Sequence, residues 1–185
     1  MLKISLCIPT YNRAELLKKL LNRLSTFDFD DLEIIIVDNK STDKTIELFK
    51  NNTYNNIKFF QNSKNIGMAN NWNRCIELAS GDYILIFHSD DLITPELISE
   101  YKKIITKYPS VGFIFSYPFK IDASDQIIEK LKVLKGNLIF YPPSFYYLMI
   151  CANLISAPGV LIKKECYEKI GRFQDFDLIA DYDMW

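Results

Sequence analysis

Two adjacent carboxylates, Asp90 and Asp91, follow a continuous apolar run from Tyr83 to Phe87. Such a run is typical of a strand that is buried on both faces, as in the middle of a parallel sheet. Ligands of open α/β sheets bind at the carboxyl edge of these strands. Paired carboxylates repel each other unless a cation or hydrogen-bond donors neutralise them, so the pair suits Mg²⁺ or Mn²⁺. Capping of a helix that starts near Pro95 explains the pair equally well.

Polar residues also follow two earlier strand candidates. The run 4–8 ends in a loop that contains Pro9, Thr10, Tyr11, Asn12 and Arg13. The run 32–37 ends at Asp38, which stands ahead of any helix start, so capping does not readily explain it, although a turn could. Because the carboxyl ends of parallel strands share one edge, we expect these loops to form one polar crevice with residues 88–91.

A third group of polar residues lies between the second and the fourth strand candidates. Asn65 and Gly67 form a turn in which glycine can take a conformation that other residues resist. Asn70, Asn71 and Asn73 then crowd the start of a helix expected over 69–79, although asparagine is a poor helix former. One of them could cap the helix, and the others suggest polar groups that face a ligand.

Strand and helix patterns alternate along the first half of the chain. Helices are expected over 14–24 and 95–108, with Asn12 as the cap of the first, and strands over 55–61, 111–117 and 159–162. The alternation predicts an α/β fold with a mostly parallel, Rossmann-like central sheet flanked by helices. Residues 120–138 are expected to form an exposed hairpin. We expect one domain over 1–185, with a softer division between a nucleotide-sugar-binding half, 1–92, and an acceptor-side half, 93–185.

Composition excludes several classes of function. The chain has 185 residues with a net charge of −1, which leaves no basic patch for nucleic acid. The four cysteines have neither metal-ligand spacing nor a paired pattern, so we expect reduced cysteines in a cytosolic protein. Met1 leads straight into a strand, and no stretch is long enough to span a bilayer, so neither a signal peptide nor a membrane span is expected.

The ordered motifs resemble those of family 2 glycosyltransferases. The segment 7–13, Cys-Ile-Pro-Thr-Tyr-Asn-Arg, is similar to the family's opening strand and loop, and 37–43 to its second-strand signature. The segments 65–67, 79–83 and 89–91 follow in the family's order, and 171–173 and 181–185 are similar to its later acceptor-side motif. No single motif is specific, but the ordered set covers nearly the whole chain.

This resemblance implies a GT-A-type fold, a nucleoside-diphosphate sugar donor, Mg²⁺ or Mn²⁺, and inversion at the anomeric carbon. It implies that Asp181 is the general base, that Asp38 accepts a hydrogen bond from the base of the donor, usually uracil, and that Asp90 binds the metal with Asp91 beside it. The substrate-binding residues expected on this basis are Pro9, Thr10, Tyr11, Arg13, Asp38, Asn65, Gly67, Asn73, Ser89 and Asp90.

The chain departs from the family pattern at two positions. His88 replaces the first acid of the metal motif, and Ala180 replaces the acid that often precedes the base. The chain also ends at Trp185, where the family normally continues, so we expect a truncated form. The expected acceptor is a saccharide or a lipid-linked saccharide, and the expected location is the cytoplasm, with peripheral association at the inner face of a membrane.

The chemistry can also be argued from the residues alone. A divalent ion held by Asp90 would stabilise charge on a departing diphosphate. A carboxylate such as Asp181 would accept the proton of the acceptor hydroxyl, for roughly 10²–10⁴-fold in rate. Two alternatives remain open: a non-catalytic nucleotide-sugar-binding module, and a sugar-phosphate nucleotidyltransferase. The second would need a glycine-rich loop after the first strand, which the segment 9–13 lacks.

Overall fold

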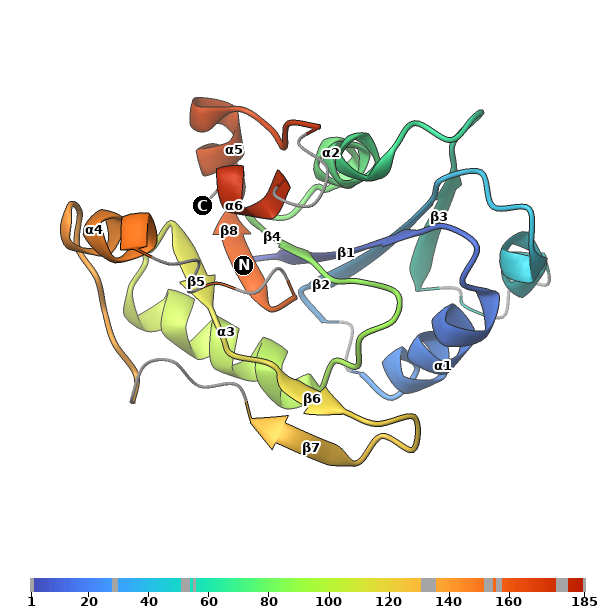
Figure 1. Cartoon of the computed structure of the whole chain (residues 1–185), viewed down its shortest axis with the longest axis horizontal. Helices are drawn as coiled ribbons and strands as arrows, with labels where there is room; N and C mark the ends of the chain where they lie inside the picture. Colours follow the sequence, from blue (N-terminus) through green and yellow to red (C-terminus); the bar gives the residue numbers. More distant parts are fainter. Residues whose placement is uncertain are drawn as a thin grey trace.

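A computed structural model describes residues 2–27, 30–50, 54, 56–130, 136–151, 155, 158–175 and 180–184. Its centre is a six-stranded sheet of order β3-β2-β1-β4-β8-β5 (Figure 1). The strands are β1 (Ile4–Thr10), β2 (Leu32–Asp38), β3 (Ile57–Gln61), β4 (Tyr83–Ile86), β5 (Phe113–Phe115) and β8 (Val160–Lys163). The predicted α/β fold with a mostly parallel central sheet is thereby confirmed.

Burial explains why the central strands are mostly apolar. Every residue of β1, β2 and β4 is buried, because helices cover both faces of the sheet. The first four strands pair in parallel, whereas β8 runs antiparallel between β4 and β5. The sheet therefore continues without a break across the expected division near residue 92.

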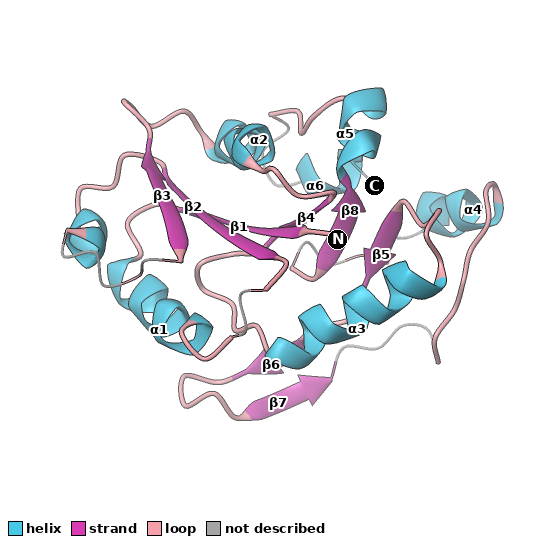
Figure 2. Ribbon diagram, turned by 180° about the vertical axis from the view of Figure 1, so that it is seen from behind, coloured by secondary structure: helices cyan, strands magenta, loops and turns pink. Residues whose placement is uncertain are grey.

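The helices form two layers, one on each face of the sheet (Figure 2). One layer contains α1 (Ala14–Leu24) and α3 (Pro95–Lys107), and the other contains α2 (Met68–Leu78), α5 (Lys164–Ile170) and α6 (Ala180–Met184). The first layer buries the leucine stripe of α1, in which Leu17 and Leu21 are fully buried. Each such leucine contributes roughly 2 kcal/mol of transfer free energy, so this stripe is core.

Three further elements lie outside the main sheet: the 3₁₀ helix η1 (Lys44–Phe49), the hairpin of β6 (Phe119–Ile121) and β7 (Ile127–Lys130), and α4 (Ser144–Cys151). A hairpin was expected over 120–138, and the structure shows one over 119–130, whereas 131–135 lie outside the described residues and 136–138 form no strand. An ion pair of 2.5 Å between Lys19 Nζ and Asp125 Oδ1 ties the hairpin turn to α1.

The start of α1 is capped differently from the prediction. Arg13, not Asn12, is the N-cap residue, and within the described ranges its own side chain makes no capping hydrogen bond. Asp43 instead accepts a hydrogen bond from the Ala14 amide, 2.9 Å away, and caps η1 through the Thr45 amide at 3.0 Å. One carboxylate therefore neutralises two helix starts and fastens two loops together.

Some strand ends also differ from the prediction. β3 begins at Ile57, and β5 spans only Phe113–Phe115. In the described part of the chain, no helix combines the length and the apolar character that crossing a bilayer requires.

Candidate active site at the carboxyl edge of the sheet

The loops that were expected to converge do meet at one edge of the sheet. Thr10 at the end of β1 pairs with Asp38 at the end of β2, and Asp38 pairs with Gln61 at the end of β3. On the other side of β1, Phe87 donates its backbone amide to Cys7 over 2.8 Å and so carries residues 88–91 to the same edge. Strand register thus explains why these loops meet at one edge, as the sequence predicts.

The loops after β1 and β2 are joined directly. Asn12, which has a positive φ of 52°, donates its backbone amide to Ser41 Oγ over 2.8 Å. Its side-chain oxygen accepts a hydrogen bond from the Thr42 amide, also over 2.8 Å. These contacts fix the position of Arg13, the residue that follows.

Asp38 is fully buried and already has several donors. Its carboxylate accepts hydrogen bonds from the Ser41 amide at 3.1 Å and 3.2 Å, from the Ser41 hydroxyl and from Gln61 Nε2 at 2.7 Å. These are the contacts of a turn that the carboxylate closes. The contact between Asp38 and the base of the donor stays a prediction.

Asn39 is a buried hub that the sequence analysis did not single out. Its Nδ2 donates to Asn65 Oδ1 at 2.9 Å and to the Gly67 carbonyl at 3.1 Å. Its Oδ1 accepts from Asn62 Nδ2 and from the Ile66 amide, both at 3.0 Å. Gly67 takes φ = 85° directly before α2, a conformation that favours glycine. The amide-rich composition of 62–67 was the available signal, but only the folded chain shows which amide is central.

The crowded asparagines of α2 mostly contact the protein's own backbone. Asn71 is buried and donates to the Val37 carbonyl over 3.1 Å. Asn73, expected to bind substrate, donates to the Phe173 carbonyl and accepts from the Phe173 amide, at 2.8 Å and 3.0 Å. Both ends of that side chain therefore position the segment that leads toward α6.

His88, Asp90 and Asp91 form a compact cluster at the end of β4. One ligand atom from each lies within 4.8 Å of the others. Thr94 is the N-cap residue of α3, and in the described part of the chain its side chain accepts no capping hydrogen bond. Neither Asp90 nor Asp91 therefore occupies the capping position of that helix.

Asp91 has an environment that disfavours its charge. Burial raises the pKa of Asp91, and the neighbouring charge of Asp90 raises it further. His88 and Arg13 act in the opposite direction, and His88 Nδ1 lies 3.6 Å from Asp91 Oδ2. A cation placed between the carboxylates would remove their repulsion.

Aromatic packing sets the orientation of His88. Its ring stacks on Trp72 with centroids 5.4 Å apart and an interplanar angle of 24°, and Trp72 meets the edge of Phe173 at 5.1 Å. His88 Nε2 is buried and has no hydrogen-bond partner among the residues that the structure describes. One imidazole and two carboxylates are a donor set that fits a divalent metal ion.

The remaining predicted residues occupy different parts of this edge. Pro9 and Thr10 belong to β1, and the buried Thr10 hydroxyl has no partner within the described ranges. Ser89 is buried, whereas Tyr11 is exposed. Asp181 is half-buried on α6, directly after Ala180, which packs in the same apolar cluster as Trp72 and Phe173.

The aromatic residues of α4 divide into two groups. Phe145 packs against Phe115 and Phe140, with centroids 5.6 Å and 4.8 Å apart. Tyr146 and Tyr147 are 66% and 64% exposed, so they are available to a partner or an acceptor. The structure therefore assigns Phe145 to packing.

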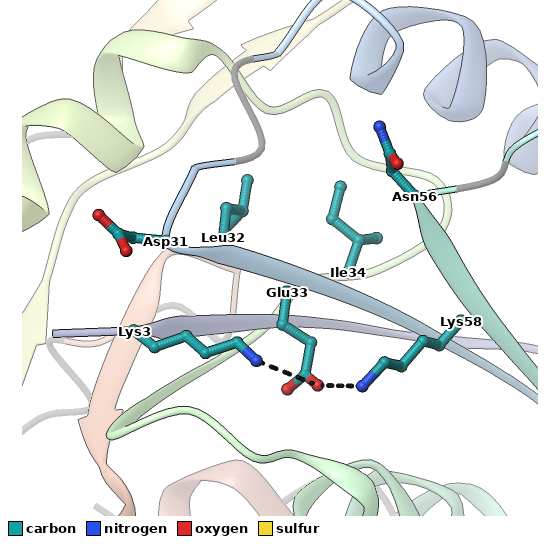
Figure 3. Close-up of a pocket in the computed structure, with 7 residues that line it drawn as sticks. All are labelled: Lys3, Asp31, Leu32, Glu33, Ile34, Asn56 and Lys58. Atoms are coloured by element: carbon teal, nitrogen blue, oxygen red, sulfur yellow. Dashed lines mark hydrogen bonds and ion pairs between the residues drawn. The ribbon is translucent and has the colours of Figure 1, made fainter. Parts of the chain in front are cut away.

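A pocket of about 330 Å³ lies at the opposite, amino edge of the sheet (Figure 3). Its buried acid, Glu33, points toward the amino groups of Lys3 and Lys58, at 3.7 Å and 2.7 Å. Ser5 and Ser80 also donate hydrogen bonds to this carboxylate. Because Glu33 is paired with these lysines and serines, we interpret this group of residues as structural support for the sheet.

Comparison with known proteins agrees with this geometry. A sequence model described as "Glycosyl transferase family 2" matches residues 5–171. The abequosyltransferase RfbV of Salmonella typhimurium is 44% identical over 101 residues, which are 52% of this chain and 30% of the relative. The matched segment therefore spans less than a third of that relative's length.

Solved structures share the fold. A mannosyltransferase from Pyrobaculum calidifontis in complex with GDP-Man and Mn²⁺ matches with a TM-score of 0.71 and 20% identity, covering 98% of this chain and 50% of that one. The TarS fragment 1–349 of S. aureus in complex with UDP-GlcNAc matches with a TM-score of 0.67 and 22% identity, covering 94% and 49%. At these identities the likeness shows the GT-A fold alone.

Proposed function

Because the chain belongs to glycosyl transferase family 2, we propose that it transfers a sugar from a nucleoside-diphosphate sugar to an acceptor hydroxyl, with inversion and with a divalent metal ion. The observation that carries this proposal is the cluster of His88, Asp90 and Asp91 at the carboxyl edge of the sheet, within 4.8 Å. The cluster lies where nucleotide ligands of α/β sheets bind.

The donor would lie across the ends of β1, β2 and β4. Residues 1–92 supply these ends, so they form the nucleotide-sugar-binding half, and residues 93–185 form the acceptor-side half. Asp38 would contact the base, for which we propose uracil, and Thr10, Tyr11 and Ser89 would line the nucleotide site. The fixed position of Asp38 favours selection between bases, because a preorganised acceptor does not have to be ordered when the ligand binds.

Asp90 and Asp91 would hold Mg²⁺ or Mn²⁺, with His88 beside them. That ion would neutralise charge that develops on the leaving diphosphate. The protein's own contribution at this point is to hold the two carboxylates and the imidazole in fixed directions. Stacking on Trp72 does this for His88.

Asp181 would accept the proton of the acceptor hydroxyl on the other face of the sugar. Bond making and breaking on opposite faces gives inversion. Two of the described residues ahead of it are held in place, Phe173 by its paired hydrogen bonds with Asn73 and Ala180 by packing in the apolar cluster. Proton removal by a positioned carboxylate is worth roughly 10²–10⁴-fold in rate.

For the acceptor we propose a saccharide or a lipid-linked saccharide, with the full-length protein peripherally associated with the inner face of a membrane. The exposed Tyr146 and Tyr147 on α4 support this proposal. Aromatic rings of this kind present an apolar face and a polar tip, which suits both sugars and membrane interfaces.

Calorimetric titration with UDP, GDP and CDP, each with and without Mn²⁺, tests the donor site. We expect UDP to bind most tightly and only weakly without Mn²⁺. Asp90→Asn should abolish the effect of Mn²⁺, whereas Glu100→Gln, which removes a carboxylate on the exposed face of α3, should not. Binding of UDP that is equally strong with and without metal would contradict the metal site.

A further inference from the structure

Arg13 forms an ion pair with Asp90, the carboxylate that the proposed function assigns to the metal. We propose that Arg13 is the resident counter-cation of Asp90, that a divalent ion displaces it, and that the released guanidinium then binds the diphosphate of the donor. This inference rests on the proposed metal site. The exchange of cations is an additional claim, because the metal-binding carboxylates and the donor site could each work without it.

The position of Arg13 suits such an exchange. Its backbone is fixed on both sides, because Asn12 is bonded to the 41–42 loop and the Ala14 amide donates to Asp43 over 2.9 Å. Its side chain, in contrast, is 45% exposed, and that of Asp90 is 41% exposed. An ion pair this exposed contributes little to stability, so an ion and water can separate it at small free-energy cost.

Charge argues that the two cations exclude each other. A guanidinium and a divalent ion on one carboxylate would repel each other at close range. Asp90 and Asp91 are adjacent carboxylates, and the positive charge of Arg13 also acts to lower the pKa of Asp91. Arg13 therefore neutralises part of the charge that would otherwise attract the metal.

The displaced side chain has a natural second partner. A guanidinium presents a planar fork of donors that matches phosphate oxygens. A nucleoside diphosphate that arrives with its metal would place those oxygens beside the end of β4. Metal binding and phosphate binding would then be coupled through one arginine, and the coupling must be reciprocal.

This exchange predicts effects of opposite sign for a single substitution. Arg13→Met should tighten the binding of Mn²⁺ alone, by about threefold to tenfold, because the competing cation is gone. The same substitution should weaken the binding of UDP in saturating Mn²⁺ by about tenfold, because the phosphate loses its fork. Damage to the fold would weaken both.

The matched control is Arg74→Met. Arg74 has the same exposed fraction, 45%, and is also paired with a carboxylate, Glu77 at 2.9 Å, but on α2. The substitution Arg74→Met removes the same charge from the protein and leaves the partner of Asp90 in place. Electron paramagnetic resonance of free Mn²⁺ measures metal binding directly, and calorimetry with UDP and with uridine separates the phosphate from the base.

For Arg13→Met we expect tighter binding of Mn²⁺, weaker binding of UDP and unchanged binding of uridine. For Arg74→Met we expect the binding of all three to stay unchanged. Unchanged or weaker Mn²⁺ binding by Arg13→Met would overturn the exchange while leaving the metal site intact. If Asp90→Asn binds Mn²⁺ as well as the unmodified protein does, the metal site itself fails and the exchange fails with it.

Discussion

Asn73 and Phe173 exchange two hydrogen bonds, one from the side-chain amide to the backbone carbonyl and one from the backbone amide to the side-chain oxygen. The side chain of Asn73, on α2, thus pairs with the backbone of Phe173, 100 residues further along the chain, as a neighbouring strand would. Trp72, the preceding residue, contacts both His88 and Phe173. This small part of α2 therefore connects the proposed metal cluster to the segment that precedes Asp181.

Asn73→Ala should loosen that segment. Losing two hydrogen bonds in a half-buried position should lower the free energy of unfolding by about 1–3 kcal/mol. If Asn73 positions the acceptor side, the transfer rate falls while the affinity for UDP is kept. Asn70→Ala is the control, since its side chain is exposed and donates only to the Ile66 carbonyl among the contacts described for it. A large loss of UDP affinity in Asn73→Ala would instead support the substrate contact predicted from the sequence.

Asp181→Asn tests the general base. The amide is nearly isosteric but cannot accept a proton, so we expect the transfer rate to fall by roughly 10²–10⁴-fold with UDP affinity unchanged. Turnover of a nucleotide-sugar donor panel on the full-length protein measures the rate, and calorimetry measures the affinity. A rate equal to that of the unmodified enzyme would exclude Asp181 as the base. Donor binding without any transfer by the unmodified protein would favour a binding module.

His88→Asp tests what the imidazole does to metal preference. An imidazole favours Co²⁺ over Mg²⁺, and a carboxylate favours Mg²⁺. We expect the substitution to shift the ratio of Co²⁺ to Mg²⁺ affinity by about tenfold toward Mg²⁺, measured by competition with Mn²⁺ in electron paramagnetic resonance. His88→Asn should weaken the binding of Co²⁺ without strengthening the binding of Mg²⁺. If both variants keep the original ratio, His88 is not a metal ligand.

Glu33 should make stability depend on pH in the acid range. Burial alone would raise the pKa of Glu33, but hydrogen bonds from Lys58, Ser5 and Ser80 together outweigh burial and lower the pKa from 4.5 to about 2. Because the folded pKa is the lower one, the stabilisation is complete above about pH 4.5 and is lost as the pH falls toward 2. We estimate the contribution at roughly 2 kcal/mol, after allowing for water in the adjoining pocket.

Glu33→Gln should therefore lower the free energy of unfolding at pH 7 by roughly 2 kcal/mol or more, and flatten its decline between pH 4.5 and 2. Urea unfolding followed by circular dichroism at several pH values measures both. Glu129→Gln, which removes an exposed partner of Lys120, should change stability by less than about 0.5 kcal/mol. An acid decline of the same steepness in Glu33→Gln would place its origin elsewhere.

The parallel part of the fold could be predicted because its signals are local. The strands β1, β2 and β4 are mostly apolar and fully buried, and each ends in polar residues that meet at the carboxyl edge. The direction of β8 could not be predicted in this way, because a short run of buried apolar residues, Val160 to Ile162, looks the same in either orientation.

The residues that meet at the carboxyl edge could be predicted from the sequence, but their contacts could not. Asp90 and Asp91 were identified from type and position, whereas the pairing of Asp90 with Arg13 depends on how two distant loops meet. The capping of α1 by Asp43 and the hub at Asn39 also join segments that are separate in sequence. Local propensity contains no information about such partners.

The antiparallel entry of β8 has a consequence for how the family can vary. Phe115 at the end of β5 pairs with Val160 at the start of β8, so the chain leaves the sheet after β5 and returns to it at a neighbouring point. Ile86 at the end of β4 pairs with the same residue, which places both points on the edge that is followed by His88 and Asp90. The hairpin and α4 thus belong to a cassette that begins and ends beside the proposed metal cluster. Such a cassette could be lengthened, shortened or exchanged for another while the donor half stays unaltered.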